Sequence, residues 1–65
     1  MNLLKQYREK QKMTQEELAE KSGISRVTIS GIENGNLETV KTGTLVKIAD
    51  ALNEPVSAVF FANDV

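Results

Sequence analysis

The side chains that most often carry covalent or metal chemistry are scarce in this sequence. Its 65 residues include no Cys and no His. Their absence excludes disulfide scaffolds, zinc sites built from these ligands, thiol nucleophiles and imidazole acid–base catalysis. The carboxylates of Glu16 and Glu20 lie one helical turn apart, but nothing near them in the sequence indicates a pocket or a metal. We therefore expect no enzyme, no metal and no cofactor.

Hydrogen bonding by Arg26 is the more promising chemistry. The donors of a guanidinium form a planar fork that matches the O6 and N7 acceptors of guanine, a pairing that discriminates this base by roughly 1–3 kcal/mol. The neighbouring Val27 offers an apolar surface suited to the methyl group of thymine. Whether either side chain can reach a base depends on the element that carries it.

Length and composition predict one small helical domain. A chain this short buries only about 60% of its unfolded surface, so we expect a single domain over residues 1–65. Hydrophobic residues make up 40% of the chain and aromatic residues only 5%, which favours aliphatic helix packing over a sheet sandwich. Neither an apolar run of about 20 residues nor a signal peptide is present, so we expect a soluble, cytoplasmic protein without membrane contact.

The charge of the chain is unevenly distributed. The net charge of -1 at pH 7 and the isoelectric point near 5.3, taken alone, argue against a nucleic-acid partner. However, residues 1–13 carry four basic residues against one acidic residue, a net charge of +3, whereas residues 14–25 and 26–65 each sum to -2. We interpret the acidic residues of the second segment as a solvated face directed away from any DNA-contacting side, namely Glu16, Glu17 and Glu20.

The spacing of apolar residues predicts five short helices separated by turn formers. The pattern at Leu45, Ile48, Ala49 and Leu52 is the most clearly amphipathic. Between the third and fourth helices we expect a loop in which Val40 points inward. The expected elements are a helix over 2–11 with Asn2 available as its cap, helices over 14–22 and 25–34, a loop over 36–43, a helix from about Thr44, and a fifth with Pro55 at its first position.

The second and third helices are predicted to form a tight pair. Thr14 followed by Glu17 is the capping-box arrangement that begins a helix, and Gly23 suits the left-handed residue that ends one. Only three residues then remain before the next helix, which Ser25 caps. Two helices joined by so short a turn must cross steeply, as in a helix-turn-helix unit.

The third helix is predicted to have a buried face and a free face. If Ile29 and Ile32 anchor it in the core, the opposite face presents polar and small side chains to solvent. A purely structural helical hairpin remains an alternative on spacing alone. The residues on the free face are Arg26, Val27, Ser30, Gly31 and Asn34.

Residues 13–35, MTQEELAEKSGISRVTISGIENG, resemble the helix-turn-helix of the lambdoid phage repressor and Cro family, also called the xenobiotic-response-element family. The resemblance continues through TLVKIADAL and EPVSAVF and covers nearly all of residues 3–61. It implies an all-α, compact, five-helix lambda-repressor-like domain that binds double-stranded operator DNA as a dimer. The implied function is a transcriptional regulator, with repression the favoured sign, whose third helix enters the major groove.

The resemblance also implies which residues contact bases. The family's base-reading positions match Arg26, Val27 and Gly31. The third of these departs from the family pattern, because glycine offers no side chain to the groove and costs a helix about 1 kcal/mol relative to alanine. Two alternatives stay open: the backbone approaches the DNA closely at this position, or one base goes unread.

Backbone contacts are implied around these base readers. Gln15 resembles the family's phosphate-binding glutamine, and the free N–H groups and dipole of the helix it begins attract an anion. Arg8 resembles an arginine that the family pairs with the glutamate at Glu33, which orients it toward a phosphate. The full set of expected phosphate contacts is Gln15, Ser25, Thr28, Ser30, Asn34, Arg8 and Lys41.

A second apolar stripe on the last helix suggests an interface. Ala58, Phe61 and Ala62 lie at helical spacing off the core face, and we expect a homodimer through them. The alternative is that Phe61 folds back onto its own core. For the whole chain, the alternative function is a protein-interaction module, of antitoxin or antirepressor type, with weak or no DNA binding. No small-molecule ligand is indicated.

Overall fold

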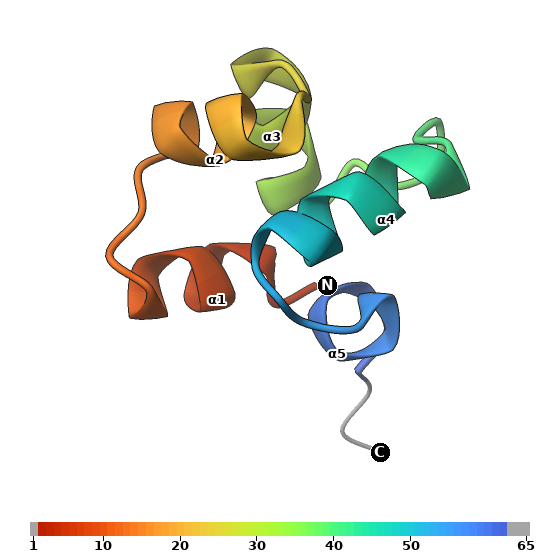
Figure 1. Ribbon diagram of the computed structural model, residues 1–65. Helices are drawn as coiled ribbons and strands as arrows, with labels where there is room; N and C mark the ends of the chain where they lie inside the picture. Colours follow the sequence, from red (N-terminus) through yellow and green to blue (C-terminus); the bar gives the residue numbers. More distant parts are fainter. Residues whose placement is uncertain (1, 63–65) are drawn as a thin grey trace.

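The computed structural model describes residues 2–62, and over this range the chain forms α-helices and no strand (Figure 1). This confirms the predicted all-α, five-helix fold. The helices are α1 (Leu4–Lys10), α2 (Gln15–Ser22), α3 (Arg26–Glu33), α4 (Thr42–Ala51) and α5 (Val56–Phe60).

One aliphatic core joins the five helices. Phe60 is the aromatic residue buried in it, and Tyr7 packs at its edge, in keeping with the low aromatic content. Full burial of a Leu, Ile or Val side chain stabilises the fold by about 1.5–3 kcal/mol. Every helix, or the residue that caps it, contributes at least one such side chain. The fully buried aliphatic residues are Leu4, Leu18, Ile29, Ile32, Ile48, Leu52 and Val59.

The helices form two groups around this core. In Figure 1, α2 and α3 cross at the top and α1 and α5 lie below them, with α4 in contact with both α2 and α5. The start of the chain closes the lower group, because the N–H of Leu3 donates to the carbonyl of Val59 at 2.8 Å. The Asn2 side chain then donates to the carbonyl of Ile32 at 2.9 Å, which ties the same segment to α3.

The first helix is shorter than predicted. It begins at Leu4 rather than at residue 2, because Asn2 lies before the helix and its side-chain oxygen accepts the N–H of Leu4 at 3.0 Å. Asn2 therefore does satisfy a free donor at the helix start, as expected of a capping residue, but from outside the helix.

The starts of the last two helices also differ from the prediction. The fourth helix begins two residues early, at Thr42, because the N–H groups of Thr44 and Leu45 both donate to the carbonyl of Lys41, at 3.0 and 3.3 Å. Pro55 precedes α5 instead of starting it, since its ψ of 149° is extended.

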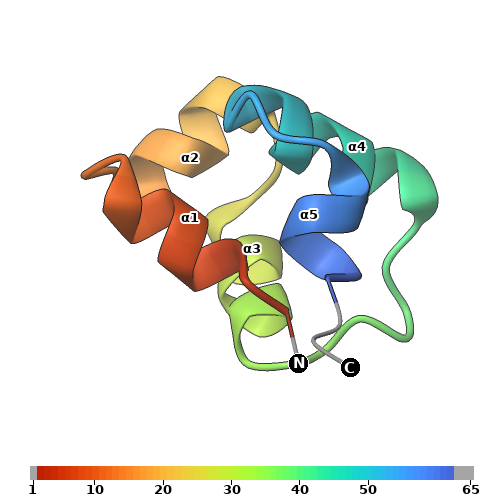
Figure 2. The ribbon, with the colours of Figure 1, turned by 90° about the horizontal axis from the view of Figure 1, so that it is seen from below.

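The segment between α3 and α4 is anchored by two apolar side chains. Figure 2 shows this segment passing along the edge of the molecule from α3 to the start of α4. Val40 packs against the core as predicted, and Leu37 does so as well. None of the helices in the described part of the chain has the length and apolar character needed to cross a bilayer.

Candidate nucleic-acid interface

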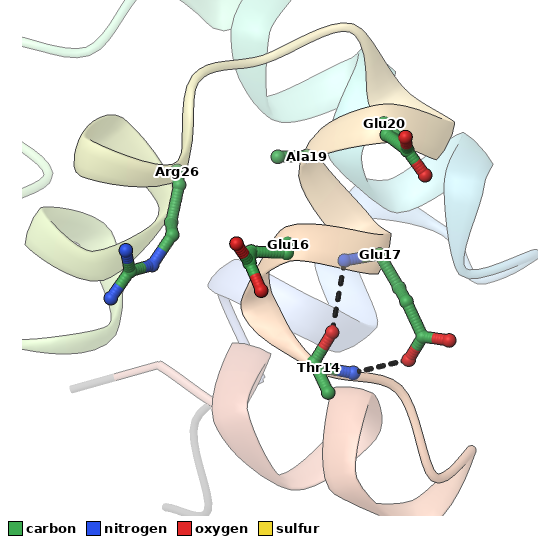
Figure 3. Close-up of a pocket in the computed structure, with 6 residues that line it drawn as sticks. All are labelled: Thr14, Glu16, Glu17, Ala19, Glu20 and Arg26. Atoms are coloured by element: carbon green, nitrogen blue, oxygen red, sulfur yellow. Dashed lines mark hydrogen bonds between the residues drawn. The ribbon is translucent and has the colours of Figure 1, made fainter.

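Local capping signals set the ends of α2. The Oγ1 of Thr14 accepts the N–H of Glu17 at 3.0 Å, and the Glu17 carboxylate accepts the N–H of Thr14 at 2.8 Å (Figure 3). This reciprocal pair satisfies two backbone donors at the helix start. At the other end Gly23 has a φ of 75°, the left-handed conformation that glycine adopts without steric cost. The predicted capping box and glycine turn are both confirmed.

Three residues separate the end of α2 from the start of α3. The Oγ of Ser25 accepts the N–H of Thr28 at 3.2 Å, and its hydroxyl donates to Thr28 Oγ1 at 2.9 Å. One turn further on, Ile29 and Ile32 are fully buried against the core. Because these two anchors fix the rotation of α3 about its axis, the opposite face must point outward.

The outward face of α3 is open at its first turn. Val27 is 82% exposed, although it is a large apolar side chain, and Arg26 beside it is also exposed. Ser30 and Gly31 are half-buried, and Asn34 is exposed at the C-terminal cap. The predicted free face of the helix is therefore present, and its members line one shallow hollow: Arg26, Val27, Ser30, Gly31 and Asn34.

A second hollow lies between α2 and the start of α3. Figure 3 shows Glu16, from α2, on the side of this hollow that faces Arg26, whereas Glu20 projects away. Glu16 and Arg26 do not form an ion pair within the described chain. Glu16 is exposed, as predicted for a solvated face, but the pairing of α2 with α3 also brings it to the hollow that Arg26 lines.

A buried ion pair joins α1 to α3. Arg8 Nε donates to Glu33 Oε2 at 2.6 Å and Arg8 Nη2 donates to Glu33 Oε1 at 3.1 Å. Their side chains are only 10% and 5% exposed. The third guanidinium nitrogen, Nη1, donates to the carbonyl of Met13 at 2.7 Å, just before α2. The pairing of Arg8 with Glu33 that the family resemblance implies is thus present.

Gln15 is a third member of this network. Its side-chain amide donates to Glu33 Oε1 at 3.0 Å, which links the first residue of α2 to the last residue of α3. Gln15 is half-buried, and it shares a hollow with Arg26. The Glu33 carboxylate therefore holds the side-chain amide of Gln15 beside the exposed start of α3.

The network changes the ionisation of its carboxylate. Burial alone raises the pKa of Glu33, but hydrogen bonds from Arg8 and Gln15 and the positive charges of Arg8 and Lys5 outweigh it, so this pKa lies below its ordinary value. The hydrogen bond to Glu33 raises the pKa of Arg8 in turn. The pair is ionised throughout the neutral range.

The remaining candidates lie at the edges of this region or far from it. Lys41 is exposed at the residue before α4. The predicted stripe of Ala58, Phe61 and Ala62 is not continuous on a helix, because α5 ends at Phe60 and only Ala58 of the three lies in it. Phe61 is the C-terminal cap and is 59% exposed, while the adjacent Phe60 is buried, so Phe61 does not fold back onto the core. Ala58 is half-buried and Ala62 is exposed.

Sequence reasoning missed Asn36, which it assigned only to a loop. The structure places the side chain of Asn36 beside Gly31, within 4.0 Å of the position that a Cβ atom on this glycine would occupy. The signal was present in the order of residues, because a helix capped by Asn34 with Gly35 next returns the following residue toward the last turn. Among residues 2–62, no group of three or more side chains suited to a metal ion lies together.

A buried anchor face, an exposed first turn and a three-residue turn between two capped helices define a helix-turn-helix domain. A family model described as Helix-turn-helix matches residues 4–59, and the chain belongs to this family. The lambdoid repressor and Cro resemblance deduced from the sequence is confirmed.

Two curated relatives from Bacillus subtilis (strain 168) are similar to the chain. The HTH-type transcriptional repressor RghR is 40% identical over 58 residues, which are 89% of this chain and 43% of RghR. The uncharacterized HTH-type transcriptional regulator RghRB is 46% identical over 52 residues, which are 80% of this chain and 37% of RghRB. The chain thus spans less than half the length of either relative.

Proposed function

We propose that this chain is a sequence-specific, double-stranded DNA-binding domain of a transcriptional regulator, with α3 inserted in the major groove. The observation that carries the proposal is the exposed first turn of α3, where Arg26 and Val27 project while Ile29 and Ile32 stay buried. Arg26 reads guanine through its planar donors, and Val27 contacts a thymine methyl group. The proposed effect on transcription is repression, since a relative that is 40% identical is named a repressor.

Phosphate contacts position the domain in this proposal. Gln15 is the first candidate, because Glu33 holds its amide at the start of α2, where free N–H groups also attract an anion. The hydroxyl, amide and ammonium groups around α3 complete the set, which comprises Ser25, Thr28, Ser30, Asn34 and Lys41.

For Arg8 the proposal differs from the phosphate contact expected from the sequence. Its guanidinium is 10% exposed and all three of its nitrogens already donate to Glu33 or Met13. We therefore propose that Arg8 positions Glu33, and through it Gln15, without itself being the main phosphate ligand.

Selection of bound sequences from random DNA, at a fixed salt concentration, tests the proposal. Arg26→Ala is expected to abolish the preference at one base pair per half-site, whereas Gln15→Ala weakens binding to all sequences alike. Lys47→Ala is the control for charge, because it removes the same positive charge from an exposed position on α4. Failure to bind any DNA at low salt, or equal uniform losses from Arg26→Ala and Gln15→Ala, would refute the proposal.

We also propose that the domain acts as a two-fold dimer through the end of α5. The support is Phe61, which is 59% exposed just after α5 and next to the exposed Ala62, since a large apolar side chain at a surface favours burial by a partner. Two recognition helices would then lie about 34 Å apart, one turn of DNA. Sedimentation of the free protein decides this point: a monomer at tens of micromolar, unchanged by Phe61→Ala, contradicts the dimer.

A further inference from the structure

The end of α3 turns back on itself in a Schellman motif. Gly35 has a φ of 100°, its N–H donates to the carbonyl of Ile32 at 2.9 Å, and the N–H of Asn36 donates to the carbonyl of Gly31 at 2.9 Å. In this motif the second residue after the cap returns to the helical residue three positions before the cap, and the side chains of these two residues meet. Here the two residues are Asn36 and Gly31.

The Asn36 side chain lies beside Gly31, at a distance that a small side chain at position 31 would also allow. A Cβ atom placed on Gly31 would lie 3.9 Å from Asn36 Nδ2 and 4.0 Å from Asn36 Cβ, which is ordinary van der Waals contact. Gly31 lines the same hollow as Arg26 and Val27. The amide of Asn36 therefore lies at the edge of the surface where a longer side chain at position 31 would project.

The contacts of the Asn36 side chain within residues 2–62 do not explain why an asparagine stands at this position. Its residue is exposed, and its amide forms no hydrogen bond within residues 2–62. The amides of Asn2, Gln11 and Gln15, by contrast, each bond to a distant part of the chain. A Schellman motif commonly has an apolar contact between these two positions, and neither glycine nor asparagine supplies one.

We infer that Asn36 is a specificity-determining residue, which supplies from the turn after α3 the base contact that Gly31 cannot make from within the helix. The chemistry of an asparagine amide identifies its target, because one N–H and one carbonyl match the N7 and N6 groups of adenine. This inference rests on the proposed function, since it requires α3 to enter the major groove.

Selection from random DNA at one salt concentration tests the inference with three proteins: the unchanged chain, Asn36→Ala and the control Thr39→Ala. Thr39 is exposed in the same loop and has no assigned role. The unchanged chain is expected to prefer adenine at one base pair per half-site besides the pairs read by Arg26 and Val27. Asn36→Ala should lose that preference, by roughly 5- to 150-fold in relative affinity, and keep the others. Thr39→Ala should keep all of them.

Relocating the amide gives a second, independent test. In the Asn36→Ala background, Gly31→Gln places an amide on α3 in the space that Asn36 vacates, and it should restore adenine preference at the same base pair. Thermal melting of each variant verifies that it is folded at the binding temperature.

The outcomes separate the inference from the proposed function. An unchanged chain that shows no sequence preference at all overturns the proposed function, and the inference with it. The inference alone is overturned if the adenine preference survives Asn36→Ala in full. It is also overturned if Asn36→Ala lowers the affinity for all sequences by the same factor.

Discussion

Glu33 accepts hydrogen bonds from two other helices at once, and this arrangement fixes where two polar side chains lie beside the candidate interface. Arg8 from α1 and Gln15 from α2 both donate to its carboxylate. The pairing with Arg8 was predictable from the family resemblance. The bond from Gln15 was not, because it depends on how α2 and α3 cross, which residue types alone do not specify.

Replacing Glu33 with Gln should destabilise the protein in a pH-dependent way. Breaking a buried pair while its partner stays charged costs roughly 3–5 kcal/mol, so a loss of about this size is expected at pH 7. The pKa of Glu33 is lowered in the folded protein, so its carboxylate stabilises the fold fully at pH values above the ordinary glutamate pKa. This stabilisation is lost as the pH falls through the pKa of the folded state. Urea unfolding between pH 3 and pH 7 measures the difference.

The contribution of Glu33 to the pH dependence can be isolated with a control. Glu38→Gln removes a carboxylate from the exposed loop and should leave the free energy of unfolding within about 0.5 kcal/mol of the unchanged protein. The difference in the free energy of unfolding between Glu33→Gln and the unchanged protein should shrink toward pH 3. If it stays constant, the ionised pair is not the source of the difference.

At the scale of helices, the boundaries that the sequence predicted are those with side-chain caps. Thr14 and Ser25 each accept a backbone N–H three residues on, and the helices begin where predicted. Lys41 and Pro55 make no side-chain cap, and both helix starts were misplaced. A cap is a local interaction between neighbouring residues, whereas an uncapped start depends on packing against the rest of the fold.

The crossing of α2 and α3 has an electrostatic consequence at Glu16. Its carboxylate shares a hollow with Arg26, so it should repel phosphates that approach the start of α3. Glu16→Gln is expected to raise affinity for nonspecific DNA about threefold at low salt, from a Coulomb energy of roughly 0.7 kcal/mol for charges about 6 Å apart in water. Titration of labelled duplex of random sequence measures the change.

Salt and a matched variant test the origin of this effect. The gain in DNA affinity from Glu16→Gln should shrink as ionic strength rises, because the Debye length falls to about 8 Å at 0.15 M. Asp50→Asn removes the same charge from an exposed position on α4 and should have a smaller effect. Equal gains from both variants would mean that net charge, and not the position of Glu16, sets the affinity.

At the scale of the whole molecule, one small core supports both the fold and the exposed turn of α3. Residues of all five helices meet in it, and the same Ile29 and Ile32 that stabilise the domain direct Arg26 outward. A domain of this length has a free energy of unfolding of only about 3–10 kcal/mol. Any large loss of packing should therefore abolish the proposed DNA binding through unfolding.

Ile48→Ala should bring the protein close to its unfolding threshold. Ile48 is fully buried in α4, and truncating such a side chain costs about 2–5 kcal/mol through lost transfer energy and the cavity left behind. Val46→Ala, on the same helix at a 40% exposed position, should change stability by less than about 0.5 kcal/mol. Urea unfolding followed by circular dichroism compares them, and similar midpoints would contradict the assigned core.

The sequence by itself determined the all-α class, the helix-turn-helix and the buried and free faces of α3. These follow from periodicity and capping, which act between residues a few positions apart. Only the tertiary structure decided that Gln15 joins Glu33, that Glu16 faces Arg26 and that Asn36 returns to Gly31. The physical reason is that each of these relations depends on the angle at which a helix crosses its neighbour or on the direction of the chain after a turn, and both are set by packing of the shared core.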